Sequence, residues 1–160
     1  MKTKEAISIF LVDDDIFCLE LYREVLTNLG YTNTTLFEKS TDCLNQLTLQ
    51  PQVIFLDYQM DNLNGIDILK KIKRFNPNII VLFISGQQNI QVAVNSLKYG
   101  AFDYIVKKDF TEDKIKLAMD KVEQLLDLLQ RRNKGSFMRR AFSAVGIFSL
   151  LLFTQKFFSK

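Results

Sequence analysis

The sequence predicts an α/β domain built around a mostly parallel β-sheet. Short apolar runs rich in β-branched and aromatic residues alternate five times with segments whose apolar residues recur at helical spacing. The runs at residues 7–12, 53–56 and 79–84 are apolar almost throughout, which is typical of strands buried on both faces. Hydrophobic residues make up 48% of the 160 residues, which is enough for the core of one domain.

The other predicted elements complete five strand–helix units. Residues 16–29 form a predicted helix with Phe17, Leu21 and Val25 at helical spacing, and Gly30 is expected to cap its C-terminus. The later elements are a second strand at 31–37, helices at 40–47, 66–74 and 90–99, a fifth strand at 104–106, and a long amphipathic helix that Thr111 caps and that ends near residue 130.

The charge is divided unevenly along the chain. Residues 1–130 carry 14 Lys and Arg against 18 Asp and Glu, whereas residues 131–160 carry seven basic side chains and no acidic one. We therefore predict a folded domain at 1–130 and a basic, apolar, helical tail at 131–160.

The tail contains an uncharged run at residues 141–155. These fifteen residues fall short of the roughly 20 that a membrane-spanning helix needs, although flanking lysines and arginines can snorkel to the lipid surface. Since no secretory signal precedes the first strand, we expect a cytoplasmic protein. From the apolar run and its basic flanks, we expect residues 137–158 to attach it to the inner face of the membrane. The alternative is a tail that packs on a partner or on a second copy of the chain.

Polar side chains follow the buried strands at the point where each strand ends. Asp13 and Asp14 follow the first strand, Asp57 the third, Ser85 the fourth and Lys107 the fifth. In open α/β sheets, ligands bind at the carboxyl ends of the strands, so these residues are expected to converge. Clustered carboxylates repel one another unless a cation neutralises them, and Mg²⁺ prefers such oxygen ligands. With a lysine and a metal to neutralise a phosphoryl group, a carboxylate becomes a plausible covalent acceptor.

Four motifs resemble those of the receiver domains of two-component response regulators. They are FLVDDD, VIFLDYQMDNLNG, VLFISG and GAFDYIVKK, and they occur in the family's order between residues 6 and 128. The resemblance implies a doubly wound, flavodoxin-like (βα)5 fold with a five-stranded parallel sheet in the order 2-1-3-4-5, followed by a C-terminal helix. Taken singly, each of these residues is more often a helix cap, a turn residue or a solvated charge.

The resemblance also implies roles for individual residues. Asp57 is the phosphoacceptor and is assisted by Ser85 and Lys107. The implied Mg²⁺ ligands are Asp13, Asp14, Asp57 and Gln59. On phosphorylation Ser85 and Tyr104 act as the switch pair, which reshapes the face formed by the fourth helix, fifth strand and fifth helix. Gln59 and Gln87 flank the phosphoryl group and tune its lifetime.

The expected partners follow from the same resemblance. A sensor histidine kinase or phosphotransfer protein supplies the phosphoryl group, and an unidentified downstream protein reads the changed face, which is also an option for a homodimer. We expect a single-domain regulator that is not an enzyme, because only about thirty residues follow the domain. For the same reason we expect no separate output enzyme domain and no direct DNA binding.

Several alternatives fit the sequence less well than a receiver domain. The chain has no histidine, which excludes Ser-His-Asp triads and a phosphohistidine carrier, and it has no GxxxxGK[ST] or GxGxxG loop. A flavin-binding fold conflicts with the acidic first loop, and a haloacid-dehalogenase-like phosphatase would need an aspartate where Gln59 stands. The remaining alternative is a degenerate receiver that works as a phosphorylation-independent binding or membrane-tethered adaptor module.

The sequence departs from the family pattern at two positions. Asp61 and Lys108 stand where the family usually has proline. Because position 108 is not proline, we expect a trans Lys107–Lys108 peptide bond.

Overall fold

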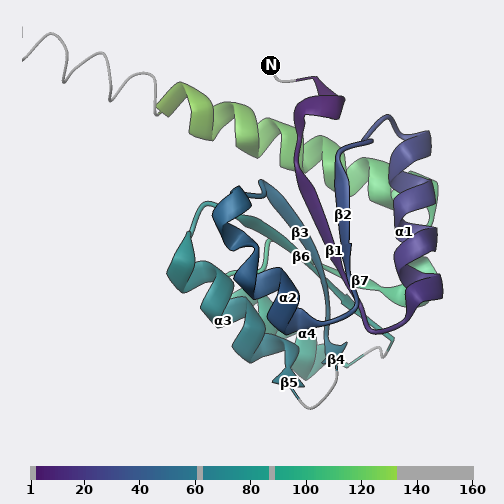
Figure 1. Cartoon of the computed structure of the whole chain (residues 1–160), viewed down its shortest axis with the longest axis vertical. Coiled ribbons are helices and arrows are strands. Elements are labelled where there is room, and N and C mark those ends of the chain that lie inside the picture. Colours follow the sequence, from purple (N-terminus) through teal and green to yellow (C-terminus); the bar gives the residue numbers. More distant parts are fainter. Residues whose placement is uncertain (1–2, 61–62, 87–88, 133–160) are drawn as a thin grey trace, which may run out of the picture. The chain divides into compact units, whose positions relative to one another are not determined.

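The computed structural model describes residues 3–60, 63–86 and 89–132 and confirms the predicted α/β fold (Figure 1). Five strands form one sheet in the order β2-β1-β3-β6-β7, and every neighbouring pair is parallel. Counted among these strands alone, this is the predicted order 2-1-3-4-5. The strands are β1 Ile9–Val12, β2 Thr34–Phe37, β3 Val53–Asp57, β6 Ile80–Ser85 and β7 Asp103–Val106.

A short hairpin of β4 Gln59–Met60 and β5 Leu63–Asn64 follows β3. Helices connect the five strands of the sheet, as predicted. The helices are α1 Ile16–Asn28, α2 Ser40–Asn45, α3 Gly65–Phe75, α4 Ile90–Lys98 and a last helix that is helical from residue 112 to the last described residue, 132. Gly30 and Gly100 follow α1 and α4 with φ of 92° and 97°, a left-handed conformation that favours glycine after a helix.

The chain forms two compact units, Met1–Val122 and Glu123–Lys160, whose boundary falls within the last helix. The sheet and the residues of the predicted site belong to the first unit. The tail at 133–160 lies outside the described residues, so the predicted boundary at residue 131 stays a prediction. Among the helices of the described residues, none combines the length and apolar character that crossing a membrane requires.

The central strands alternate their side chains between two apolar layers. Phe10 and Val12 of β1 join one core cluster, which includes apolar side chains of α2, α3 and α4. These three helices cover that face of the sheet, and α1 lies on the other (Figure 1). All residues of β1, β3 and β6 are buried, so the carboxyl ends of these strands are held in a rigid frame.

The buried face of α1 differs from the predicted one. Phe17 and Leu21 are 83% and 46% exposed, whereas the helix buries Leu19, Tyr22 and Leu26. The predicted and the observed buried residues both have helical spacing, and nearly every residue of the first two turns of α1 is apolar. Periodicity alone therefore does not decide which face of α1 is buried. The choice depends on packing: the Tyr22 ring lies 4.3 Å from the ring of Phe110.

The exposure of α1 residues gives a direct test of this packing. We expect Leu19→Ala to lower the free energy of unfolding by about 2–4 kcal/mol, because it removes a fully buried side chain and leaves a cavity. Phe17→Ala is the matched control and should change it by less than about 0.5 kcal/mol. Urea unfolding of both variants measures the difference, and a larger loss for Phe17→Ala would show that α1 is rotated from the described position.

Candidate functional site

The register of the parallel strands brings the predicted site residues to one edge of the sheet. Val12 pairs with Leu56, so Asp13 stands level with Asp57 at the ends of β1 and β3. Asp57 pairs with Ile84, which places Ser85 one residue further along β6. Ser85 pairs with Val106, so Lys107 follows directly after the end of β7.

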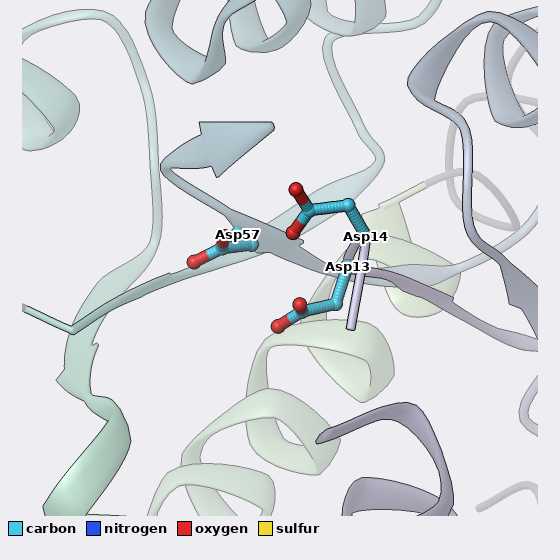
Figure 2. A group of neighbouring side chains, drawn as sticks. All are labelled: Asp13, Asp14 and Asp57. Atoms are coloured by element: carbon cyan, nitrogen blue, oxygen red, sulfur yellow. The ribbon is translucent and has the colours of Figure 1, made fainter. Parts of the chain in front are cut away.

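Three carboxylates meet at this edge, as predicted. Asp13, Asp14 and Asp57 each offer an oxygen, and these oxygens all lie within 4.8 Å of one another. Figure 2 shows the three side chains extending toward the same side, with Asp13 and Asp14 at the end of one strand and Asp57 on its neighbour. Asp13 and Asp57 are 0% and 1% exposed, whereas Asp14 is exposed, so the group opens to solvent on the Asp14 side.

Asp57 is a buried acid whose carboxylate is left without hydrogen bonds. Neither of its oxygens has a hydrogen-bond partner among the described residues. The Lys107 Nζ lies 3.4 Å from Asp57 Oδ2, an ion-pair distance that is too long for a strong hydrogen bond. Burial, and to a lesser degree the charge of Asp13, raise the pKa of Asp57 to about 7, although Lys107 acts in the opposite direction.

Lys107 is the only basic side chain that pairs with Asp13 or Asp57 among the described residues. Its Nζ lies 2.8 Å from Asp13 Oδ2, closer than to Asp57. Burial would lower the pKa of Lys107, but the hydrogen bond to Asp13 and the charges of both acids outweigh it and raise the pKa above its ordinary value. The lysine therefore stays protonated and neutralises part of the acidic group.

Tyr22 is a site residue that the sequence analysis missed. Its side chain is 1% exposed, and its hydroxyl donates a hydrogen bond of 2.9 Å to Asp13 Oδ2. Burial, together with the charge of Asp13, raises the pKa of Tyr22, so the hydroxyl keeps its proton and acts as a donor. The available signal was a single tyrosine nine residues after Asp13, on the helix face that was not predicted to be buried.

The loop after Asp57 is closed by a glycine. Gly65 begins α3, and its amide donates a hydrogen bond of 3.2 Å to the Tyr58 carbonyl. A Cβ at this position would lie 2.9 Å from the carbonyl oxygens of both Asp57 and Tyr58, so only glycine allows this approach without movement of the backbone. Gln59 begins β4 with an exposed side chain, and its predicted roles as metal ligand and lifetime-tuning residue stay predictions.

The predicted switch residues lie next to the acidic group in the sheet. Ser85 ends β6 and is 0% exposed, while Tyr104 is a half-buried residue of β7 that packs against the core cluster. Gln87 and Asp61 lie outside the described residues. The described residues contain no cis peptide bond, so the Lys107–Lys108 bond is trans, as expected from the absence of proline.

The donor set fits a hard divalent cation. Carboxylate oxygens are the ligands that Mg²⁺ prefers, and it usually keeps several waters, which the exposed Asp14 side would admit. The two Asp57 oxygens are buried, have no hydrogen-bond partner among the described residues and contact only Lys107 at 3.4 Å, which is the strongest observation in favour of a cation-binding role. Asp13, Asp14 and Asp57 are therefore the residues that would hold the ion.

The chain matches the family described as the response regulator receiver domain over residues 9–120. It is 36% identical over 106 residues to the transcriptional regulatory protein ZraR of Escherichia coli (strain K12), covering 66% of this chain and 24% of ZraR. It is 30% identical over 125 residues to the DNA-binding transcriptional regulator NtrC of Klebsiella pneumoniae, covering 78% of this chain and 26% of NtrC. The crystal structure of NtrX from Brucella abortus is similar with a TM-score of 0.72 and 28% identity, covering 79% of this chain and 29% of that chain.

The chain therefore belongs to the response regulator receiver family, which confirms the resemblance drawn from its motifs. Receiver domains serve phosphorylation-dependent signalling, interact with histidine kinases and bind Mg²⁺ in an acidic pocket. The chain spans about a quarter of the length of the curated relatives it matches, so the similarity concerns the receiver alone.

These relatives correct two expectations about the output. The prediction that the protein is not an enzyme and has no separate output domain is contradicted, because the relatives are regulators about four times as long as the matched segment. The matched residues account only for the receiver, so they show no enzymatic role either. The expectation that the protein does not bind DNA directly conflicts with its similarity to NtrC, a DNA-binding transcriptional regulator, although the similarity again covers the receiver only.

The raised pKa of Asp57 predicts how stability depends on pH. In EDTA at pH 8, we expect Asp57→Asn to increase the free energy of unfolding by about 2 kcal/mol. Because Asp57 has a pKa of about 7 when folded, the folded state binds more protons than the unfolded chain between about pH 4 and 7. The wild-type stability contributed by this group is therefore present at low pH and is lost as the pH rises through 7. Urea unfolding at several pH values measures the effect.

Asp67→Asn is the matched control for this prediction. Asp67 is an exposed residue of α3 that pairs with Lys70, so its loss should change the free energy of unfolding by less than about 0.5 kcal/mol. If Asp57→Asn were no more stable than the wild type at pH 8, the inference that Lys107 compensates the buried charge of Asp57 only in part would be wrong.

Proposed function

We propose that this protein is a signalling switch that accepts a phosphoryl group on Asp57 in the presence of Mg²⁺. The observation that carries the proposal is the state of Asp57, a 1% exposed carboxylate without hydrogen-bond partners among the described residues. A buried carboxylate that has no hydrogen bond and only a 3.4 Å ion pair to Lys107 is costly to hold, and strongly shifted acids of this kind cluster at functional sites. The neighbouring Asp13, Asp14 and Lys107 supply the surroundings that phosphoryl transfer requires.

The transfer uses an Asp57 oxygen as the nucleophile. A new bond forms between this oxygen and phosphorus, while the phosphorus–nitrogen bond of the donor's phosphohistidine breaks and the imidazole leaves, taking a proton from solvent. Lys107, already 3.4 Å from Asp57 Oδ2, can neutralise the negative oxygens of the incoming group. The three aspartates, with Gln59 as the further predicted ligand, would hold Mg²⁺, which would supply the remaining positive charge.

Ser85 and Tyr104 are proposed to report the phosphorylated state. Ser85 lies one residue beyond the level of Asp57, so a small shift of its hydroxyl reaches the phosphoryl oxygens. Tyr104 is half-buried and pairs with Phe83, two residues before Ser85. Its ring would turn into the space that Ser85 vacates. Gln59 and Gln87 are proposed to set how long the acyl phosphate survives.

The proposed output surface consists of α4, β7 and residues 112–122. On α4, the side chains of Ile90, Val94 and Leu97 are 81%, 53% and 49% exposed, an apolar stripe at helical spacing. A pocket of about 240 Å³ between β7 and the last helix is lined by Tyr104 and the exposed Leu117. A change at Tyr104 would thus alter a surface suited to a downstream protein or a second copy of the chain.

Phosphorylation separates this function from that of a degenerate receiver. We expect the full chain to be labelled by radioactive acetyl phosphate with Mg²⁺ but not in EDTA, because the clustered carboxylates repel an anionic donor when no cation is present. Asp57→Asn should abolish labelling, and Asp67→Asn should retain it. Absence of labelling in the wild type would favour the phosphorylation-independent adaptor, and undiminished labelling of Asp57→Asn would place the acceptor elsewhere.

We also propose that residues 137–158 attach this cytoplasmic protein to the inner face of the membrane, on the basis of their sequence. We expect the full chain to float with vesicles that contain anionic phospholipid and to float less as salt is raised. Leu151→Asp should release most of it, because it places a charge within the uncharged run. Lys160→Gln is a control with nearly unchanged binding. A full chain that never floats would favour a tail that packs on protein.

A further inference from the structure

Tyr22 connects the middle of α1 to the acidic group. Its ring is buried against Phe110, with ring centroids 4.3 Å apart, and its hydroxyl lies 2.9 Å from Asp13 Oδ2. A buried phenol normally finds a hydrogen-bond partner, and a backbone carbonyl would serve that purpose. The hydrogen bond of the Tyr22 hydroxyl instead goes to a carboxylate of the candidate metal site.

The Asp13 carboxylate is held by three donors. Asp13 Oδ1 accepts a hydrogen bond of 3.0 Å from the Asp15 amide, and Oδ2 accepts from Tyr22 Oη and from Lys107 Nζ, which lies 2.8 Å away. The side chain is 0% exposed, so water does not replace a lost donor. Its orientation toward Asp14 and Asp57 therefore depends on these contacts.

Of the two side chains that bind Asp13 Oδ2, Lys107 is expected to move away when Asp57 is phosphorylated. Lys107 already contacts Asp57 at 3.4 Å, and a phosphoryl group on Asp57 would place new negative charge within its reach. As Lys107 moves toward that charge, its bond to Asp13 weakens. Among the described residues, Asp13 is the only carboxylate that acts on the Tyr22 hydroxyl, and the Tyr22 ring is fixed by packing against Phe110.

We propose that Tyr22 is a positioning residue that holds Asp13 in the orientation needed for the cation, without contacting the cation itself. The inference rests on the proposed Mg²⁺ site. Groups that hydrogen-bond to metal-site carboxylates fix their orientation, and their loss typically weakens metal binding by about 10–100-fold. The simpler alternative is that Tyr22 only fills the core between α1 and Phe110.

Magnesium affinity of matched variants distinguishes these roles. Tyr22→Phe keeps the ring and its packing and removes only the hydroxyl. Tyr31→Phe is the control, since Tyr31 is equally buried but follows the opposite end of α1 from the site. We expect the dissociation constant for Mg²⁺ of the full chain, from an NMR titration of backbone amides at pH 8, to rise about tenfold in Tyr22→Phe. In Tyr31→Phe it should change less than about twofold, within the usual scatter of a remote site. An unchanged constant in Tyr22→Phe would overturn the proposal.

A double variant tests whether Tyr22 acts through Asp13. In an Asp13→Asn background, the hydroxyl no longer has a carboxylate to hold, so adding Tyr22→Phe should weaken Mg²⁺ binding little further. An equal loss in both backgrounds would indicate a general structural effect and would overturn the proposal. Circular dichroism in EDTA verifies that each variant is folded. If the wild type binds no Mg²⁺, both the proposed metal site and the role of Tyr22 are refuted. If the wild type binds Mg²⁺ and Tyr22→Phe has no effect, only the role of Tyr22 is refuted.

Discussion

The chemistry of this receiver depends on one half-buried ammonium group placed between two buried carboxylates. Lys107 lies 2.8 Å from Asp13 and 3.4 Å from Asp57, and both acids are almost fully withdrawn from solvent. Without a cation between them, their mutual repulsion and loss of hydration would be severe. Because the lysine binds Asp13 more closely, its single charge offsets only part of the charge of the two acids, and the Asp57 oxygens have no hydrogen-bond partner among the described residues. Asp57 is thereby kept available for a metal ion and for a phosphoryl group.

The buried sheet stabilises the fold enough to hold these charged groups together. β1, β3 and β6 are buried along their whole length, and their register sets Asp13 level with Asp57. The apolar layers on both faces stabilise the fold enough to tolerate a site that is electrostatically unfavourable. Gly65 contributes by allowing α3 to begin against the backbone of Asp57 and Tyr58, which a larger residue would prevent. The same frame links Asp57 to Ser85 and Tyr104 and so to the surface proposed for output.

The fold and the convergence of Asp13, Asp57 and Lys107 could be predicted because they follow from strand periodicity and from the residues that end each strand. The buried face of α1 could not, since Phe17 and Leu21 form as good an apolar stripe as Leu19 and Leu26. That choice depends on Phe110, which is distant in sequence. Tyr22 was missed for the same reason, because its role requires knowing that the hydroxyl reaches Asp13. The expectation that no output domain exists was corrected by the length of the relatives, which cannot be inferred from this sequence.

The proposed switch depends on transfer of the phosphoryl group to Asp57 and to no other acid of this cluster. Borohydride reduces an acyl phosphate on aspartate to homoserine, so the modified residue can be located by peptide mass spectrometry after treatment of the full chain with acetyl phosphate and Mg²⁺. We expect homoserine at position 57, with Asp13 and Asp14 unmodified, because of these three acids only Asp57 combines burial with oxygens that have no hydrogen-bond partner among the described residues. Homoserine at position 13 or 14, or at none of the three in a chain that carries label, would contradict it.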